Sequence, residues 1–312
     1  MKLEDFENRL AKNARHWGKW ARRRGIECYR VYDRDIPEFA FIVDVYGMRA
    51  HLQVYERDSA GISNDESGLL AAIHEVTARV LAMPPEHVVV KHRARRQAGE
   101  QHEKTGARGE DFVVHEGGLR FLVNLEAYLD TGLFLDHRNT RAMVAADARV
   151  KRMLNLFCYT ASFTIYAAQG GAVQSLSLDL SNTYLQWAAR NFDLNRLDAR
   201  AHRLQRADVM QWLSEGGRQE CFDLIVLDPP AFSTSKAMST VLDIQRDHAI
   251  LLEHCARLLT PHGVLYFSTN LRSFKLQTVP SLLSGEEISS RTVPEDFRNR
   301  RVHRCWRFAR RG

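Results

Sequence analysis

The sequence predicts an α/β protein, in which a small α+β domain precedes a doubly wound, mostly parallel sheet. From residue 152 onward, short apolar runs alternate with segments of helical periodicity, as in strands joined by crossover helices. The run Leu224 to Leu227 is apolar throughout, which is typical of a central strand covered on both faces. Upstream, strand patterns flank a single helical segment. The expected parts are a basic N-terminal helix over 1–34, the small domain over 35–127 and the doubly wound domain over 128–312.

Size and composition narrow the class of protein. The 312 residues are 45% hydrophobic and 26% charged, enough for two domains and a sizeable core. No apolar run approaches the ~20 residues of a membrane span, and the charged N-terminus lacks the apolar core of a signal peptide. Five scattered cysteines without a CxxC pair favour reduced thiols over a zinc site or a disulfide framework. We therefore expect a cytoplasmic protein with no membrane attachment and no metal.

The excess positive charge is concentrated in three places. The formal net charge is +6, and basic residues gather in Lys12 to Arg24, in Lys91 to Arg96 and in the tail from Arg291, which has eight arginines. Such patches favour a polyanionic partner, most simply nucleic acid. A solvated surface can have the same composition, so charge alone leaves both interpretations open.

The elements of the small domain follow from periodicity and turn residues. Residues 4–24 are expected to form an amphipathic helix with Phe6 and Leu10 on its apolar face and Gly25 at its end. The remaining expectations are two strands around Gly47 within 39–55, a helix over 66–83, a strand over 88–91, a mobile polar loop over 97–110 and a hairpin over 112–123.

The second part of the chain is expected to alternate strands and helices. The strands cover 152–157, 173–178, 202–205, 222–227 and 263–268, and the helices cover 162–169, 181–191, 209–213 and 244–259. Ligands of open α/β sheets bind just beyond the carboxyl ends of the strands. Residues at those ends are therefore the first candidates for a site.

Three acids occupy successive strand ends. Asp179 lies about 22 residues beyond the first strand, a spacing that suits a carboxylate accepting hydrogen bonds from ribose hydroxyls. Asp208 could receive an adenine amino group. Asp228 is followed by Pro229 and Pro230, whose stiff backbone offers acceptor carbonyls, and Phe232 could stack on a planar base. A single strand-end Asp is usually a helix cap, but that interpretation is weaker for three acids on one rim.

The first loop discriminates between cofactors. Residues 157–164 contain no glycine, so the GxGxxG turn that brings a backbone close to a pyrophosphate is absent. A helix N-terminus capped by Thr160 or Ser162 could still receive a carboxylate such as that of methionine. An adenosine with a methionine tail is S-adenosylmethionine, which is the predicted cofactor.

Several segments resemble the class I methyltransferases that modify large-subunit ribosomal RNA, and most closely the K half of the bifunctional K/L enzymes. They are 8–10 with 18–21, 130–138, 155–160, 181–188, 228–232, 245–248, 267–270 and 301–306. The resemblance covers nearly the whole chain and implies a Rossmann-like fold and methylation of guanine N7 in 23S ribosomal RNA or a large-subunit precursor. In that family a glycine usually stands at the position of Ala161. The L half is not present, so the chain is expected to be either a stand-alone K-type protein, with a separate L-type methyltransferase as partner, or a fragment.

Strand-end position and resemblance together give the candidate site. The expected cofactor-binding residues are Phe134, Asp136, Arg138, Asn155, Phe157, Thr160, Asp179, Leu180, Asp208, Val209 and Asp228. The expected catalytic residues are Asp228, Pro229, Pro230, Phe232 and Asn270. The family resemblance implies that Asp228 and Asn270 bind the edge of the guanine base. Two alternatives stay open: Asp136 as a helix N-cap with Arg138 on the surface, and His248 as either a catalytic base or, preferably, a residue that orients its helix.

Three other functions remain to be weighed. A cytosine-C5 RNA methyltransferase needs a cysteine nucleophile near the base, and residues 231–233 and 268–270 contain none. Cys221 and Cys255 are both expected in the core. A non-catalytic RNA-binding assembly factor would keep the fold without turnover. A nicotinamide oxidoreductase is the weakest candidate, because the pyrophosphate loop is missing.

Overall fold

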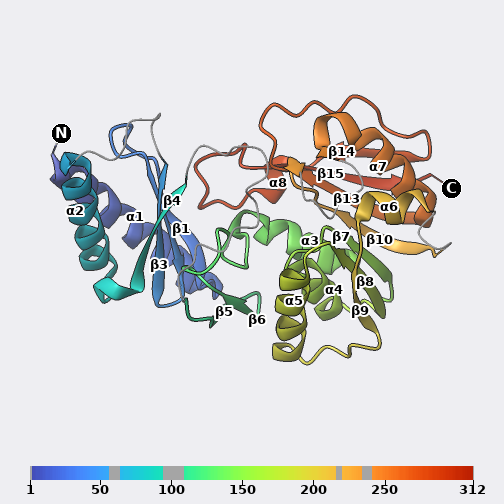
Figure 1. Cartoon of the computed structure of the whole chain (residues 1–312), viewed down its shortest axis with the longest axis horizontal. Helices are drawn as coiled ribbons and strands as arrows, with labels where there is room; N and C mark the ends of the chain where they lie inside the picture. Colours follow the sequence, from blue (N-terminus) through green and yellow to red (C-terminus); the bar gives the residue numbers. More distant parts are fainter. Residues whose placement is uncertain (1, 56–63, 94–108, 216–219, 234–240, 312) are drawn as a thin grey trace. The chain divides into compact units, whose positions relative to one another are not determined.

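The computed structural model describes residues 2–55, 64–93, 109–215, 220–233 and 241–311 and divides the chain into two compact units (Figure 1). Unit 1 consists of Met1–Gly118, Val123–Thr131 and Glu295–Asn299, and unit 2 consists of Leu119–Leu122, Gly132–Pro294 and Arg300–Gly312. The expected loop over 97–110 lies outside the described residues except for its last two. The domain boundaries inferred from the sequence stay predictions.

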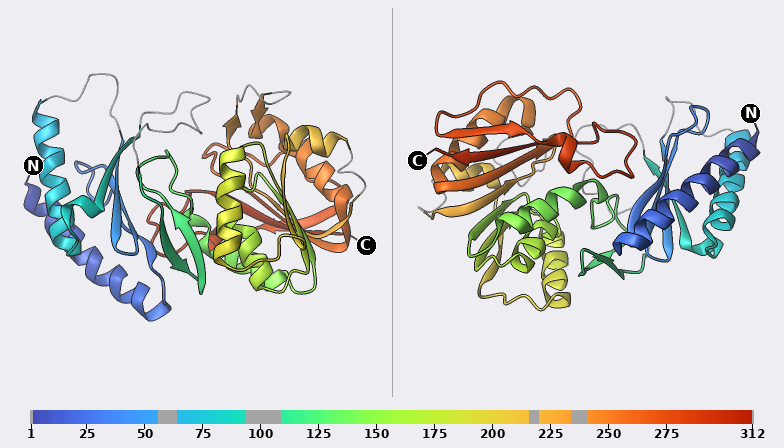
Figure 2. Two further views of the ribbon diagram at one scale, coloured as in Figure 1. Left: turned by 60° about the horizontal axis from the view of Figure 1, so that its bottom comes forward. Right: turned by 180° about the vertical axis from the view of Figure 1, so that it is seen from behind.

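Unit 1 is built on a four-stranded sheet in the order β1-β2-β3-β4. Its strands are β1 (Cys28–Asp33), β2 (Phe41–Tyr46), β3 (Arg49–Tyr55) and β4 (Val88–Arg93). The first three are antiparallel neighbours, and β4 runs parallel to β3. Helices α1 (Leu3–Arg24) and α2 (Asn64–Leu81) lie side by side on one face of this sheet, as the views of Figures 1 and 2 agree, and the short helix η1 (Pro85–His87) leads into β4.

The core of unit 1 forms between α1, α2 and the sheet. Phe6 and Leu10 of α1 are fully buried there, as the amphipathic pattern predicts. The helix ends at Gly25, which takes the left-handed conformation (φ 63°) and donates its N–H to the last turn. Strand β1 was not predicted. Its Arg30 is buried because its guanidinium bonds both oxygens of Asp44, at 2.7 and 3.0 Å, so the strand lacks an apolar alternation.

The predicted hairpin is present. Strands β5 (Phe112–Glu116) and β6 (Leu119–Val123) form a two-stranded sheet, and the turn between them uses Gly117 and Gly118 at positive φ. Positive φ costs glycine little, which is why the pair suits a tight turn.

Unit 2 contains a seven-stranded sheet in the order β14-β15-β13-β10-β7-β8-β9. Its strands are β7 (Arg152–Leu156), β8 (Gln174–Asp179), β9 (His202–Arg206), β10 (Phe222–Leu227), β13 (Leu259–Thr269), β14 (Leu283–Glu287) and β15 (Arg304–Arg310). The five from β13 to β9 are parallel, whereas β14 and β15 pair antiparallel. The predicted doubly wound, mostly parallel sheet is confirmed, and β14 and β15 were missed.

Helices cover both faces of this sheet. They are α3 (Arg138–Asp147), α4 (Ser162–Gln169), α5 (Asn182–Leu194), α6 (Val209–Ser214), α7 (Ile244–Leu258) and α8 (Ser289–Thr292), with the short helix η2 (Leu135–His137) before α3 and a small ladder of β11 (Phe232–Ser233) and β12 (Leu242–Asp243) before α7. Leu224 and Val226 pack with α3 and α4, whereas Ile225 and Leu227 pack with α6 and α7. Because alternate residues of β10 serve opposite cores, the whole run is apolar. Among the described residues no helix is long and apolar enough to cross a membrane.

Candidate functional site

The carboxyl ends of the parallel strands bring the predicted acids to one edge of the unit 2 sheet. In the strand register Leu227 pairs with both Leu156 and Phe267 on its two sides, and Leu156 pairs with Leu178. Asp179 ends β8, and Asp228 directly follows β10. The expectation that these two residues lie on one rim is therefore confirmed, and Asn270, exposed directly after β13, lies at the same edge.

The loop after β7 has an unusual backbone. Phe157, Tyr159 and Ala161 all take positive φ, at 58°, 52° and 59°. Ala161 is the N-cap of α4 in a left-handed conformation (φ 59°, ψ 30°) that glycine adopts with less strain. The family resemblance expects glycine here, and the chain keeps the geometry with alanine. The ring of Phe157 is half-buried against the core of unit 2.

The expected cap of α4 is wrong. Neither Thr160 nor Ser162 caps the helix, since the N-cap residue has no side-chain hydrogen bond and Thr160 Oγ1 instead donates to the Gly132 carbonyl at 2.7 Å. Within the described part of the chain, no side chain caps the first turn of α4. Orphan N–H groups at a helix N-terminus suit a carboxylate, as the predicted methionine tail requires.

Asp179 ties the first loop to the end of β8. One carboxylate oxygen accepts the Tyr159 N–H and the other accepts the Ser181 N–H, each at 2.9 Å. Two backbone donors hold the carboxylate in one orientation, as a ribose-binding acid needs. The next residue, Leu180, is half-buried and its carbonyl accepts from Arg206 Nε at 3.1 Å.

Asp208 does cap a helix. Its Oδ1 accepts the N–H groups of Met210 and Gln211, at 3.0 and 3.4 Å, so the cap interpretation holds for this acid. Val209 begins α6 and is buried in the core. Both residues follow β9 at the same end of the sheet as Asp179.

Asn155 lies inside the protein rather than at its opening. Its side chain is buried between β7 and α4, where Nδ2 donates to Thr164 Oγ1 at 2.9 Å, and Thr164 in turn contacts Ser177 at 2.7 Å. Asn155 Oδ1 has no hydrogen-bond partner among the residues that the structure describes. The residue links strand and helix behind the first loop.

Gly132 docks the segment 130–138 onto the first loop. Its N–H donates to Tyr159 Oη at 2.8 Å and its carbonyl accepts from Thr160. Its φ is +96°, and a Cβ at this position would lie 2.3 Å from Trp187 Cζ2. Only glycine fits there. Phe134, two residues on, is 40% exposed with its ring centroid 5.1 Å from that of Tyr159, which gives an aromatic surface next to Asp179.

Two histidines connect Asp136 with Asp228, a feature that the sequence did not reveal. Asp136 Oδ2 lies 2.9 Å from His303 Nδ1, and His303 stacks on His137 with ring centroids 4.3 Å apart. His137 Nε2 lies 3.6 Å from Asp228 Oδ2. The N-cap alternative for Asp136 is wrong, because the N-cap of α3 is His137 without a side-chain cap bond. Arg138 is buried, so its surface alternative is wrong too.

Burial affects the protonation of His137. It lowers the pKa of His137, while Asp228 raises that pKa and His303 lowers it further. His137 is therefore neutral near pH 7. One ligand atom from each of Asp136, His137 and His303 lies within 4.8 Å of the others, a spacing that a divalent ion could bridge. The direct Asp136–His303 hydrogen bond satisfies both groups without an ion, so we describe the cluster as a hydrogen-bonded network.

Asp228 is held from its other side by Ser268, another residue that sequence reasoning missed. Ser268 Oγ donates to Asp228 Oδ1 at 2.6 Å across the adjacent strands β10 and β13. Pro229 is buried and Pro230 half-buried, and Phe232 is half-buried in β11, which pairs with β12 at the start of α7. The acid and the two prolines thus form a fixed rim at the edge of the sheet.

His248 is fully buried with both ring nitrogens engaged. Nδ1 lies 2.9 Å from the Gln245 carbonyl, and Nε2 accepts the Gln277 N–H at 3.2 Å. A ring that donates from Nδ1 to its own helix and accepts at Nε2 orients α7. These contacts favour the positioning role over the catalytic base.

The cysteines offer no nucleophile beside Asp228. Burial raises the pKa of the Cys158, Cys255 and Cys305 thiols. Cys221 was expected in the core and that expectation is wrong: it is exposed, because β10 begins one residue later. It sits at the amino end of β10, about 23 Å along the strand from Asp228 at ~3.3 Å per residue.

Much of the predicted basic surface is used inside the fold. Lys91 is buried, and its ammonium donates to the carbonyls of Leu125, Glu126 and Tyr128. In the tail, Arg304 pairs with Glu287 and Arg307 with Asp147. Residues 94–96 lie outside the described part of the chain. Among the described residues α1 carries further exposed cations, and the tail carries others at Arg298, Arg300 and Arg311.

Comparison with known proteins gives consistent matches. A family model described as S-adenosylmethionine-dependent methyltransferase matches residues 70–291. Ribosomal RNA large subunit methyltransferase K of Neisseria meningitidis serogroup B is 53% identical over 97% of this chain and 86% of that protein. Ribosomal RNA large subunit methyltransferase K/L of Ectopseudomonas mendocina is 47% identical over 98% of this chain but only 42% of that protein.

Solved structures share the fold at low sequence identity. A SAM-dependent methyltransferase from Streptococcus mutans superposes with a TM-score of 0.76 at 21% identity, covering 99% of this chain and 82% of that one. A methyltransferase solved in complex with SAH has a TM-score of 0.71 at 22% identity, with coverage of 97% and 81%.

Proposed function

The chain belongs to the family of S-adenosylmethionine-dependent methyltransferases, and from that premise we propose that it methylates N7 of a guanine in 23S ribosomal RNA, either free or in a large-subunit precursor. The observation that carries the proposal is the Asp228 rim, where a carboxylate held by Ser268 at 2.6 Å meets two prolines, while the neighbouring Cys305 thiol is fully buried with a raised pKa. A cytoplasmic location is part of the proposal, because that is where ribosomal subunits are assembled.

The donor set of unit 2 fits S-adenosylmethionine. Asp179, fixed by two backbone N–H groups, would accept hydrogen bonds from the ribose hydroxyls. Phe134 and Tyr159 offer aromatic surface for the adenine. The first turn of α4, which has no side-chain cap, would receive the methionine carboxylate. When bound, the cofactor supplies a methyl group on a positively charged sulfur.

The residues at the rim suit an acceptor that needs no proton removed. Guanine N7 has an available lone pair, so a rigid site can act largely by holding N7 in line with the methyl group. Asp228 would accept hydrogen bonds from the guanine N–H groups, with Asn270 beside it and Phe232 stacking on the ring. His137, neutral because it is buried, would keep Asp228 oriented without neutralising it. A base must leave its stack to reach such a site.

Methyl transfer from labelled S-adenosylmethionine to unmodified 23S ribosomal RNA tests the proposal. Asp228→Asn should reduce kcat by about 10²–10³-fold, as for other groups that orient a reacting centre, and leave cofactor affinity within a few-fold. Asp223→Asn is the matched control, since it removes the same charge at the opposite end of β10, where Asp223 accepts from Thr260 at 2.7 Å. Full activity of Asp228→Asn, or cofactor binding without transfer by the wild type, would count against the proposal. The second outcome would favour a non-catalytic RNA-binding factor.

The acceptor site also argues against methylation at cytosine C5. That reaction needs a thiolate at the ring, and Cys305, the cysteine paired with Ser268 in the sheet, is fully buried with a raised pKa. The chain spans about two-fifths of the length of the K/L relatives, and we also propose that an L-type methyltransferase acts on the same substrate.

A further inference from the structure

Helix α1 presents a row of basic residues on one face. Its exposed basic residues recur at alternating spacings of three and four, which places them in line along the helix. The row consists of Arg9, Lys12, His16, Lys19 and Arg23, all exposed. Over fourteen residues it extends about 21 Å at ~1.5 Å rise per residue. No acid occurs in α1 after Glu7, so nothing on the helix itself neutralises the row.

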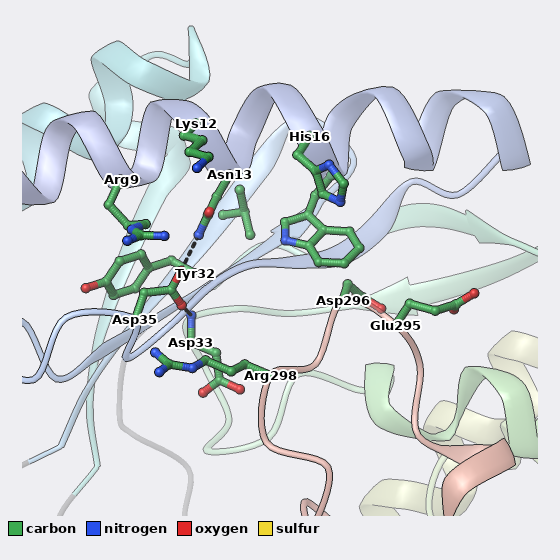
Figure 3. Close-up of a pocket in the computed structure, with 12 residues that line it drawn as sticks. Arg9, Lys12, Asn13, His16, Tyr32, Asp33, Asp35, Glu295, Asp296 and Arg298 are labelled. Atoms are coloured by element: carbon green, nitrogen blue, oxygen red, sulfur yellow. Dashed lines mark hydrogen bonds between the residues drawn. The ribbon is translucent and has the colours of Figure 1, made fainter.

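The first half of the row forms one wall of a hollow in unit 1, with a volume of about 610 Å³. Figure 3 shows Arg9, Lys12 and His16 extending from α1 over the hollow, with Asp33 and Asp35 of the opposite wall below them. Trp17, the segment 295–298 and the end of β1 complete the lining. A hollow of this size is in the range of small-ligand sites.

The acids of the hollow already have partners in the fold. Asp35 accepts from Asn13 Nδ2 at 2.6 Å, Asp33 accepts the Asn299 N–H at 3.2 Å, and Asp296 accepts the Arg30 N–H at 2.8 Å. The remaining acid, Glu295, pairs with Arg24 at 2.7 Å. These bonds hold the walls together and spread the negative charge over neighbouring donors.

The cations of the α1 wall, unlike the acids, have no partners in the described part of the fold. Among the residues that the structure describes, Arg9 and Lys12 form no hydrogen bond or ion pair of their own. Trp17 is half-buried with its ring edge-on to His16 and Trp20, at centroid distances of 4.6 and 5.5 Å. The α1 wall therefore offers unused positive charge beside aromatic surface. The other wall offers fixed carboxylates and the guanidinium of Arg298, which donates to the Arg34 carbonyl at 3.1 Å.

We propose that this hollow binds one nucleotide of the RNA substrate. A backbone phosphate would lie against Arg9 and Lys12, and its base would lie beside Trp17 with its N–H donors toward Asp33 and Asp35. A nucleotide is anionic at one end and a hydrogen-bond donor at the other, which matches the two walls better than a bare anion does. The inference rests on the proposed function for the statement that the substrate is RNA.

The rest of the row indicates a polymer rather than a free nucleotide. Lys19 and Arg23 continue the line of charge beyond the residues that line the hollow. A mononucleotide would leave these two cations without a role, whereas a single strand has further phosphates to place along the helix. In this proposal unit 1 binds nucleotides of the substrate other than the methylated guanine.

The test measures affinity for a single-stranded oligonucleotide from 23S ribosomal RNA by fluorescence anisotropy across a potassium chloride series. Arg9→Gln/Lys12→Gln should weaken binding and lower the slope of log affinity against log salt by about 0.7, the value for the one phosphate that these two residues contact on a single strand. Arg15→Gln/Arg22→Gln is the matched control, because it removes two exposed charges from α1 at positions that do not line the hollow. Its slope should stay at the wild-type value.

A second measurement separates this inference from the proposed function. In the methylation assay Arg9→Gln/Lys12→Gln should raise KM for RNA with kcat and cofactor affinity unchanged, and 4-thiouridine in the RNA should cross-link to the peptide containing residues 9–17. Equal slopes in the two double variants, or cross-links confined to other peptides, would overturn the inference even if methylation proceeds. A wild-type protein that binds RNA through α1 but transfers no methyl group would overturn the proposed function alone.

Discussion

The substitution Gly132→Ala tests how the segment bearing Phe134 and Asp136 is held against the first loop. Gly132 donates to Tyr159 Oη at 2.8 Å and accepts from Thr160 Oγ1 at 2.7 Å, at a φ of +96°. A methyl group here would meet Trp187 Cζ2 at 2.3 Å, and the Trp187 ring is fixed because its Nε1 donates to the Leu122 carbonyl at 3.0 Å. The backbone, not the ring, must move.

Two costs add in this variant. A non-glycine residue in a sparsely populated backbone region costs about 1–3 kcal/mol, and overpacking a filled interior costs a further 1–3 kcal/mol. Together they give a loss of about 2–6 kcal/mol in the free energy of unfolding, compared with the roughly 5–15 kcal/mol by which a native protein is stable. Because the segment must shift to relieve the clash, cofactor affinity should fall at least about tenfold, or ~1.4 kcal/mol.

Urea denaturation gives the first quantity and calorimetric titration with S-adenosylmethionine gives the second. Gly118→Ala is the control, because Gly118 also has a positive φ, +78°, but no atom lies within 4 Å of its added Cβ. That variant should lose only the backbone part, about 1–3 kcal/mol, and keep cofactor affinity. Equal stability losses for the two variants, with cofactor affinity unchanged in both, would refute the reasoning about Trp187.

Three further predictions concern binding, acid stability and a buried ion pair. Asp179→Asn should weaken S-adenosylmethionine binding by about 10–100-fold, the value of a hydrogen bond to a charged group, and titration calorimetry showing wild-type affinity would contradict its ribose role. Burial lowers the pKa values of His137 and His202, so the unfolded state binds more protons than the folded state below pH ~6.5. The free energy of unfolding should therefore fall as the pH drops from 7 toward 5, by at most about 1.4 kcal/mol per pH unit for each histidine. Urea denaturation at each pH should show a shallower fall for His202→Gln, and an identical pH profile would exclude that residue. Arg30→Met should cost about 3–5 kcal/mol by leaving Asp44 buried without its partner, whereas Arg304→Met, at a more exposed pair, should cost about 1 kcal/mol or less by the same denaturation assay.

The sheet of unit 2 was predictable wherever a strand is covered on both faces. The run at 224–227 is apolar because its alternate residues pack against α4 on one side and α7 on the other. Strand β14 was missed because four of its five residues are exposed, and β15 because Arg304, Arg307 and Arg310 interrupt its apolar residues at every third position. A buried arginine such as Arg30 cannot be recognised from the sequence alone, because the carboxylate that pairs with it, here Asp44, is not known until the fold is known.

The acids of the site were predictable for a geometric reason, and the groups that hold them were not. Parallel strands end at one edge, so Asp179 and Asp228 could be placed together from the sequence. His303 reaches Asp136 from 167 positions away, a contact that leaves no periodic pattern. Thr160 was expected to cap α4, but the carbonyl of Gly132 competes for its hydroxyl, and local cap rules cannot include such a tertiary partner.

The identity of the methylated nucleoside decides whether the protein acts on guanine N7. 23S ribosomal RNA lacking the modification would be incubated with the protein and S-adenosylmethionine, digested to nucleosides and analysed by mass spectrometry. We expect 7-methylguanosine with the wild type and with Asp223→Asn, and its loss with Asp228→Asn. 5-Methylcytidine, or a methylated product that persists undiminished in Asp228→Asn, would contradict that expectation.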